Sequence, residues 1–310
     1  MSTTPANSGI RVTVDELVRL HADAHRLSLA PRQLRTLAQT GAHLTAFRGR
    51  GMEFAEVRPY APGDDVRHID WRVTARSGHT VTKLFREERE RPVSFIIDQT
   101  ASMQFGTRVA FKSVVAARAT ALLAWAAADH GDRVGGIVLR DDHITELRPR
   151  RGSSAVLPLL RVLAHEAIAH NAPTTHWTVA LQRAARLNRP GALWVIVSDF
   201  YTPDQQAETL LAELRRHSDV MLLLIYDALE RDPPPPGRYG FSNGTRYAAL
   251  DLHGDTTRWS YQQPFLARMR FLEELARRLR FPLLQLGTHE PIAATLCRQL
   301  AVATHSEHRS

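Results

Sequence analysis

Two apolar segments of this sequence end in carboxylate and hydroxyl side chains that could hold a metal ion. Val93–Asp98 ends in a carboxylate and is followed by Thr100 and Ser102, and Leu193–Asp199 ends in Ser198-Asp199. The loop before a later helical pattern adds two hydroxyls, those of Thr174 and Thr175. Oxygen ligands with few carboxylates and room for water suit a hard cation such as Mg²⁺. These residues therefore predict a divalent-cation site, provided that the fold brings them together.

The segments that must position these residues have the pattern of a parallel sheet. Val93–Asp98, Leu193–Asp199 and Val220–Asp227 are continuous apolar runs, and each is followed by a helical pattern. Such runs are typical of strands covered by helices on both faces. The predicted fold is therefore an α/β domain with a doubly wound, mostly parallel sheet, where ligands bind beyond the carboxyl ends of the strands. The helices of this domain are expected at Val109–Ala128, Ser154–Ala169, Thr178–Leu187, Gln205–His217, Pro264–Arg280 and Pro291–Val302.

Shorter elements complete the predicted organisation. A hairpin is expected from Val134–Arg140 and His143–Arg148, which flank an Asp-Asp turn. Near the start, Thr13 and Glu16 form a capping box that begins a helix over Val14–Leu29. A second short helix is expected from Pro31 to about Gly41, and further strands at Thr80–Glu88, near Arg246–Leu252, at Arg258–Tyr261 and at Pro282–Gly287.

These elements predict four regions along the chain. They are N-terminal helices (1–41), a small strand-containing module (42–91), the α/β domain (92–302) and a short tail (303–310). The module contains several aromatic residues, too many for a disordered linker. We therefore expect it to pack on the α/β domain.

Composition narrows the class of protein. The 310 residues are 44% hydrophobic and 23% charged, and the formal net charge is +8. The positive charge makes nucleic acid a candidate partner, but acidic residues are interspersed among the basic ones. No basic stripe interleaved with aromatics is present, so a mixed, solvated surface is favoured over nucleic-acid binding.

The sequence also gives no sign of secretion or of a membrane span. The longest uncharged run in the most apolar helical pattern, Ala119–Ala128, is half of the roughly 20 residues that a span requires. The first residues lack the pattern of a signal peptide. Cys297 is the only cysteine, so no intrachain disulfide can form. A cytoplasmic protein is the prediction.

One other pattern imitates a phosphate-binding loop. The spacing from Gly106 to Lys112-Ser113 is that of a P-loop. The second glycine is missing, and Phe111 would block the close approach of the backbone to a phosphate. We therefore reject nucleotide binding and expect Lys112 at the surface of the first helix of the domain.

The remaining acidic and histidine residues are given structural roles. His68 and Asp70, near Asp64 and Asp65, could form a hydrolytic centre, but no nucleophile can be paired with an oriented base. The structural alternative is that Asp70 or Asp65 caps a short helix and that Trp71 is packed. The other histidines give no H-x-x-x-H pair with a third ligand that predicts zinc.

The order of the candidate metal ligands resembles the metal-ion-dependent adhesion site of von Willebrand factor type A domains. Asp98-x-Thr100-x-Ser102 is followed by a threonine six residues before the leucine of an Ala-Leu pair, and then by Ser198-Asp199. Thr175 is that threonine, since the pair is Ala180-Leu181, and Thr174 is the alternative. Capping of a helix could explain the first three residues, but it explains neither Thr175 nor Asp199. The resemblance implies that Mg²⁺ (or Mn²⁺) is bound by Asp98, Thr100, Ser102, Thr175 and Asp199.

The segment before the first strand resembles the bacterial family known as domain of unknown function 58. The matching motifs are Gly49–Phe54, Arg58-Pro59-Tyr60, Pro62–Trp71 and Ala75-Arg76, and the resemblance spans roughly residues 40–290. It implies a non-catalytic protein-interaction module whose metal takes a carboxylate from the partner, and which acts as an adaptor for a MoxR-type AAA+ ATPase. A metal-dependent hydrolase acting on nucleic acid or phosphoesters is the alternative.

Overall fold

The computed structural model describes residues 9–27, 29, 52–60, 69–87, 91–165, 176–201, 205–242 and 247–305. The chain divides into two compact units. Met1–Ala38 and Arg91–Ser310 form the larger unit, and Gln39–Glu90 form the smaller one.

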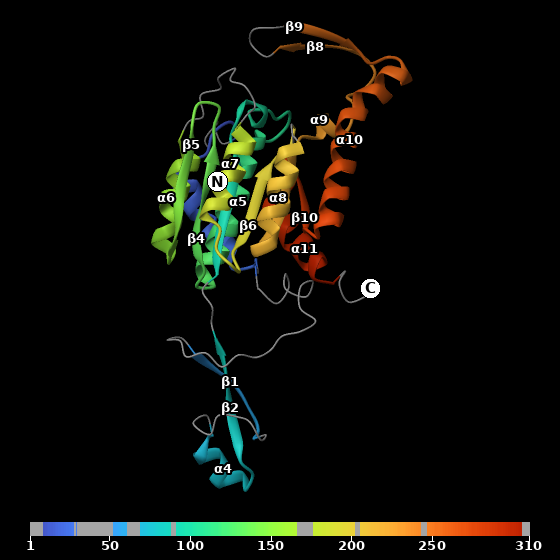
Figure 1. Ribbon diagram of the computed structural model, residues 1–310. Helices are drawn as coiled ribbons and strands as arrows, with labels where there is room; N and C mark the ends of the chain where they lie inside the picture. The colour runs from blue at the N-terminus through green and yellow to red at the C-terminus, as the bar shows by residue number, and fades with distance from the viewer. Residues whose placement is uncertain are drawn as a thin grey trace, which may run out of the picture. The chain divides into compact units, whose positions relative to one another are not determined.

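The larger unit is built on a six-stranded sheet (Figure 1). Its strands stand in the order β10-β7-β6-β3-β4-β5. All neighbours are parallel except β4 and β5, which form the expected antiparallel pair at one edge. The predicted doubly wound, mostly parallel α/β fold is therefore confirmed. The strands are β3 (Pro92–Asp98), β4 (Arg133–Leu139), β5 (Ile144–Arg151), β6 (Leu193–Ser198), β7 (Asp219–Tyr226) and β10 (Leu283–Gly287).

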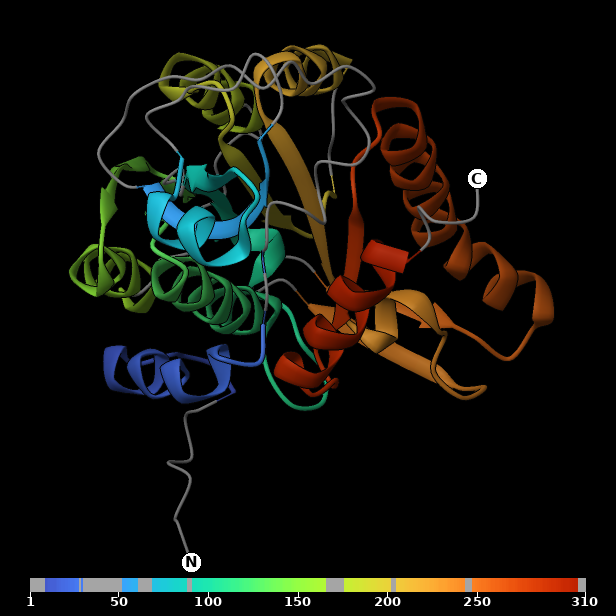
Figure 2. The same ribbon diagram turned by 90° about the horizontal axis from the view of Figure 1, so that it is seen from below.

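Helices cover both faces of this sheet (Figure 2). Because side chains alternate along a strand, Phe95 and Ile97 of β3 enter one hydrophobic core and Ile96 enters the other. The first core is closed by α1 (Val14–Arg19), α2 (His21–Ala24), α5 (Lys112–Asp129), α6 (Ser153–Ala164) and α11 (Ile292–His305). The second is closed by α7 (His176–Leu187), α8 (Gln205–His217) and α10 (Asp255–Leu279).

Helix α5 is almost entirely inside the molecule. Of its residues only Arg118 and Asp129 are not buried, as expected of a helix that is apolar all round. No described helix combines the length and the apolar content needed to cross a bilayer.

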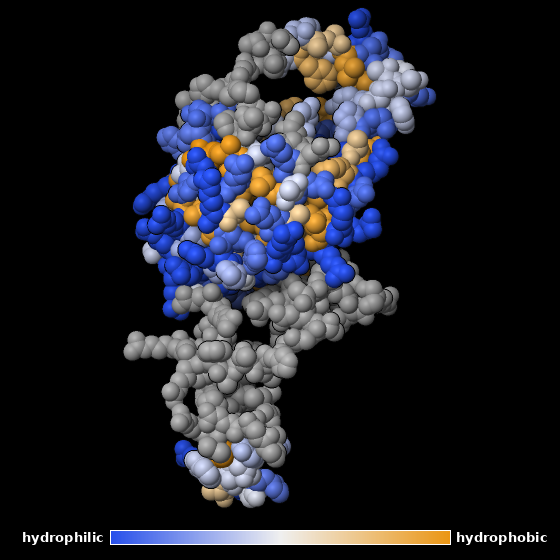
Figure 3. Space-filling view, viewed as in Figure 1, coloured by the Kyte–Doolittle hydropathy of each residue, from blue (hydrophilic) through white to orange (hydrophobic). Residues whose placement is uncertain are grey.

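Short elements lie beyond the carboxyl ends of the strands. Helix α9 (Ala228–Arg231) follows β7, and a separate hairpin of β8 (Arg238–Ser242) and β9 (Tyr247–Asp251) follows α9. Figure 1 places this hairpin past the end of the sheet opposite to the start of β3. In Figure 3 the hairpin carries apolar side chains, whereas the visible face of the helical layers is largely hydrophilic with apolar residues between the charges.

The structure corrects three of the expectations for these elements, and a fourth is not tested. The first helix ends early, because α1 and α2 stop at Ala24 instead of Leu29. Strand β8 lies where no strand was expected. Residues 258–261 are helical, because α10 begins at Asp255 and Pro264 lies inside it instead of at its first position. The predicted helix over 31–41 falls outside the described residues.

The smaller unit contains a two-stranded antiparallel sheet and one helix. Strands β1 (Met52–Pro59) and β2 (Val81–Glu87) pair with an irregularity between Phe54 and Glu56, and β2 confirms the strand expected at Thr80–Glu88. Helix α4 (Trp71–Ser77) has Asp70 as its N-cap, with the carboxylate accepting from the amides of Arg72 and Val73. The structural role of Asp70 is therefore confirmed. The expected packing of Trp71 is wrong, because this side chain is exposed.

Candidate functional site

The two carboxylates predicted to hold a metal lie at neighbouring strand ends. Asp98 is the last residue of β3, and Asp199 directly follows β6. These strands are parallel neighbours in a register that pairs Ile97 with Val197. Both carboxylates therefore reach the same edge of the sheet, and each is only 1% exposed.

The Asp98 carboxylate is held by hydroxyl and amide donors on both of its oxygens. Its Oδ1 accepts from the amide of Thr100 at 3.0 Å and from Thr100 Oγ1 at 2.7 Å. Its Oδ2 accepts from Ser198 Oγ at 2.6 Å. Thr100 Oγ1 is in turn 3.4 Å from Ser102 Oγ. Three of the predicted ligands, Asp98, Thr100 and Ser102, thus form one cluster of oxygen atoms.

This cluster is not simply a helix cap. Thr100 is the N-cap of a short 3₁₀ helix (η2, Ala101–Met103), but its side chain makes no capping hydrogen bond. The hydroxyl is instead directed to Asp98. The loop is fixed from the β4–β5 turn, where Asp141 Oδ1 accepts from the amide of Ala101 at 3.1 Å.

The pKa of Asp98 is raised above its ordinary value of 3.8. Burial is the larger cause and the negative charge of Asp199 the second, while the hydrogen bonds from Ser198 and Thr100 act in the opposite direction. Burial and a like charge both penalise the ionised carboxylate, and a nearby cation offsets both penalties. The oxygen atoms of the cluster and the uncompensated negative charge of the buried Asp98 carboxylate together fit a hard divalent cation.

Lys112 contradicts the expectation of a surface residue. It begins α5, is 1% exposed, and places its Nζ 2.7 Å from Asp199 Oδ2 and 2.7 Å from Glu230 Oε1. The sequence pattern could not show this, since the two carboxylates come from distant segments. Asp199 therefore already has one cationic partner inside the protein, and its Oδ1 accepts from the amide of Tyr201 at 3.1 Å.

Glu230 is positioned by the end of the next strand. Asp227 follows β7 and caps α9, and in the same capping box Glu230 Oε2 accepts a hydrogen bond from the Asp227 amide at 3.0 Å. The buried Asp227 also accepts from Thr107 and from Thr288 Oγ1. Burial opposes ionisation of Asp227, but these hydrogen bonds prevail and lower its pKa below the ordinary 3.8. Asp227, at the end of a third strand, thus positions Glu230, which in turn holds Lys112 beside Asp199.

The residue after Asp199 has an unusual backbone conformation. Phe200 has a φ of 49°, in the left-handed region that few residues other than glycine adopt. Its amide donates to Ser198 Oγ at 2.9 Å, and its buried ring stacks on Trp177 with centroids 5.7 Å apart. Ser198 therefore links the Asp98 carboxylate to the loop after β6, a role that the sequence reading did not assign to it.

One predicted ligand cannot be placed. Thr175, and Thr174 beside it, lie outside the described residues. The described chain resumes at α7, where Ala180 and Leu181 are buried in the second core. The threonine in the ligand set therefore stays a prediction.

Comparisons with known proteins identify relatives of the chain. The family model described as "Protein of unknown function DUF58" matches residues 56–269. "Uncharacterized protein Rv1480" of Mycobacterium tuberculosis is 30% identical over 230 residues, which are 74% of this chain and 72% of that protein. "Uncharacterized protein Mb1516" of Mycobacterium bovis matches to the same extent.

Three solved structures are similar at low identity. BatB from Bacteroides thetaiotaomicron is 14% identical with a TM-score of 0.44, over 69% of this chain and 98% of that one. An aerotolerance-related membrane protein from Bacteroides fragilis is 15% identical with a TM-score of 0.45, over 70% and 99%. A von Willebrand factor type A protein from Catenulispora acidiphila is 12% identical with a TM-score of 0.40, over 74% and 44%.

Proposed function

The chain belongs to the DUF58 family, and we propose that it is a metal-dependent protein-interaction module and not an enzyme. The observation that carries the proposal is the buried Asp98 carboxylate, whose pKa is raised and whose neighbours are the hydroxyls of Thr100 and Ser102. Mg²⁺ or Mn²⁺ would be held by Asp98, Thr100 and Ser102, with Thr175 as a further hydroxyl ligand and Asp199 as a second negative charge. When bound, the ion supplies an open coordination position that a partner's carboxylate can fill.

The surroundings of the site favour an acidic partner. Arg268 of α10 lies with its Cζ 5.6 Å from the ring of Tyr201 and its Nη2 3.8 Å from Glu230 Oε2. Its side chain is 9% exposed, and its Nε and Nη1 find no hydrogen-bond partner in the described part of the chain. These two nitrogens are buried and do not face a partner directly, but the positive charge of the guanidinium favours the approach of acidic groups. It would add to the attraction of the metal for an acidic side chain.

Exposed aromatic side chains supply apolar contact area for a protein partner. Tyr201 follows Asp199 by two positions and is 65% exposed, Tyr247 of the β8–β9 hairpin is 76% exposed, and Trp259 of α10 is 62% exposed. Tyrosine, tryptophan and arginine are the residues that dominate binding energy at protein interfaces. The resemblance noted in the sequence points to a MoxR-type AAA+ ATPase as this partner.

Metal binding is tested by titration calorimetry with Mg²⁺ and Mn²⁺. We expect Asp98→Ala to abolish binding with the fold retained, because it removes the central carboxylate of the oxygen cluster. Asp142→Ala is the matched control, since Asp142 is a half-exposed carboxylate that pairs with His143 on the β4–β5 turn. Equal affinity in wild type and Asp98→Ala would refute the metal site.

Partner binding is tested with the purified MoxR-type ATPase of the same organism. Capture by the immobilised wild type should exceed capture by Asp98→Ala, while Asp142→Ala should behave as wild type. Mg²⁺ is held constant in all samples, because a chelator would also strip the nucleotide-bound Mg²⁺ of the ATPase. Equal capture by wild type and Asp98→Ala would show that the interaction does not depend on the metal.

A further inference from the structure

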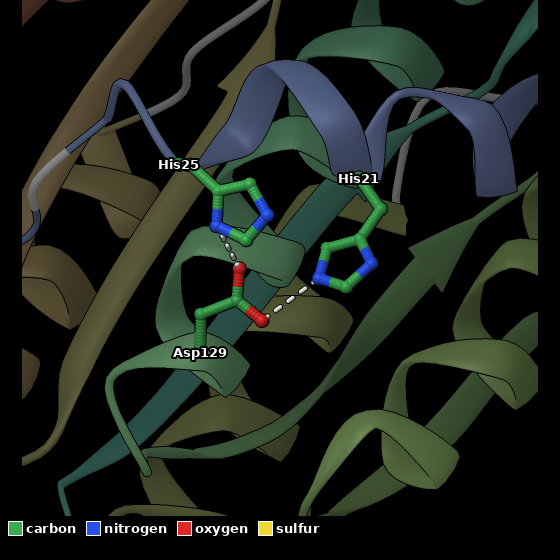
Figure 4. A group of neighbouring side chains, drawn as sticks. All are labelled: His21, His25 and Asp129. Carbon is green, nitrogen blue, oxygen red and sulfur yellow. Dashed lines mark hydrogen bonds and ion pairs between the residues drawn. The ribbon is translucent and has the colours of Figure 1, made fainter.

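A second cluster of metal-ligating side chains lies where helix α2 meets the end of α5 (Figure 4). Asp129 is the last residue of α5, and His21 and His25 approach it from α2 and its C-cap. His21 Nε2 is 2.8 Å from Asp129 Oδ1, and His25 Nδ1 is 3.2 Å from Asp129 Oδ2. Figure 4 shows all three side chains directed toward one another.

The local helix geometry explains why both imidazoles face the carboxylate. His21 and His25 are four residues apart, and His25 still has helical backbone angles of −57° and −18°. Residues at this spacing lie on one face of a helix. Sequence reading alone gave no third ligand for this pair, because Asp129 is 108 positions from His21.

We propose that His21, His25 and Asp129 bind a transition-metal ion of the Zn²⁺ class. Their ligand atoms lie within 4.8 Å of one another. Donors bound to one tetrahedral Zn²⁺ at about 2.0–2.2 Å are about 3.3–3.6 Å apart. Closure of the site therefore requires only a small movement, which the 63% exposed side chain of His25 can make.

One histidine of the cluster packs against buried residues of the domain core. The ring of His21 stacks on Trp125 with centroids 4.4 Å apart, and Trp125 Nε1 donates to the carbonyl of Leu17 at 3.1 Å. Both Trp125 and Leu17 are buried. The stacking on a buried ring therefore restricts the orientation of the His21 imidazole.

The chemistry of this cluster differs from that of the carboxyl-edge site. Two imidazoles and one carboxylate suit Zn²⁺ and its neighbours, whereas Mg²⁺ prefers oxygen ligands. The two sites also lie at opposite ends of α5, whose 18 residues span about 27 Å. The cluster is partly open to solvent, so water can complete a tetrahedral coordination. A metal here would fasten the N-terminal helices to α5, independently of the proposed function.

The test uses the full chain without a histidine tag, stripped of metal with EDTA and desalted. Zn²⁺ is titrated by calorimetry, and Co²⁺ is titrated by its visible d–d absorption, which reports tetrahedral coordination. We expect one equivalent of tight Zn²⁺ binding and a Zn²⁺-dependent rise in Tm, because a ligand that binds only the folded state stabilises it. His25→Ala and Asp129→Asn should each weaken Zn²⁺ binding at least tenfold, since even outer contacts of metal ligands contribute about 10–100-fold.

Two variants serve as controls. His143→Ala removes a histidine that also pairs with a carboxylate, that of Asp142, at 2.7 Å. This variant and Asp98→Ala should bind Zn²⁺ as wild type does. The proposal is overturned if wild type fails to bind Zn²⁺, if His25→Ala and Asp129→Asn both keep wild-type affinity, or if Asp98→Ala removes the binding.

Discussion

Replacement of Lys112 by methionine tests whether one internal cation holds the carboxyl edge of the sheet together. Methionine keeps an unbranched apolar chain but removes an ammonium that lies 2.7 Å from a carboxylate oxygen of Asp199 and 2.7 Å from one of Glu230. Lys112 and Asp199 are each 1% exposed, so the variant leaves a buried carboxylate without its partner. Removal of one member of a buried ion pair costs about 3–5 kcal/mol.

This cost is large enough to measure by thermal unfolding. In a domain of some 200 residues, 1 kcal/mol corresponds to about 2–4 °C in Tm. We therefore expect Lys112→Met to unfold roughly 6–20 °C below wild type in the absence of divalent ions. Mg²⁺ should restore part of this loss, because the ion would supply positive charge next to Asp199.

Arg118→Met is the matched control on the same helix. Arg118 Nε is 2.6 Å from Glu16 Oε1, but the two side chains are 19% and 28% exposed. Partly solvated ion pairs contribute about 0–1 kcal/mol to the free energy of unfolding, so Arg118→Met should lose little stability. Mg²⁺ should raise its Tm no more than it raises that of wild type. The reasoning is refuted if Lys112→Met unfolds no earlier than Arg118→Met. The metal part alone is refuted if Mg²⁺ stabilises both variants equally.

Three further outcomes are expected. Thr175→Ala should weaken Mg²⁺ binding in calorimetry less than Asp98→Ala, because a neutral hydroxyl holds a hard cation less strongly than a carboxylate; a loss in Thr174→Ala alone would shift the ligand by one residue. The purified chain should not hydrolyse ATP, because Lys112 of the P-loop-like segment is buried against two carboxylates; turnover that survives repurification and disappears in Lys112→Ala would contradict this. Asp227→Asn should lower the free energy of unfolding in urea by about 1–3 kcal/mol at neutral pH, since the ionised carboxylate accepts several buried hydrogen bonds. Because folding lowers the pKa of Asp227, its contribution is present above 3.8 and declines as the pH falls below it, so an unchanged difference between the two proteins in acid would count against this account.

The sheet could be predicted because its strands are continuous and apolar. Leu193–Ser198 and Asp219–Tyr226 each enter the core along almost their whole length, and only strands covered on both faces need that pattern. The positions of Asp98 and Asp199 then followed, since residues after neighbouring parallel strands meet at one edge. Thr100 and Ser102 followed from their spacing to Asp98. These inferences needed only local sequence and one rule of topology.

Helix α10 shows where local signals mislead. Proline favours the first turn of a helix, so Pro264 predicts a helix start at that position. The helix begins instead at Asp255, after Gly254, whose residue type provides no side-chain cap. The residues between, from 255 to 263, contain tryptophan and tyrosine, which favour strands when judged alone. In the folded chain Tyr261 donates to the carbonyl of Leu229 and Arg258 donates to that of Pro234, so contacts with the segment after β7 accompany the helical conformation of these residues.

The charged residues of α5 show why several contacts at both candidate sites could not be predicted from the sequence. A buried helix can place a charged side chain only where another segment supplies its partner, and α5 carries its charges at Lys112, Arg118 and Asp129. At the first position the partners are Asp199 and Glu230, and at the last they are His21 and His25. Every one of these contacts joins segments far apart in the chain, so neither helical spacing nor a short motif could reveal them.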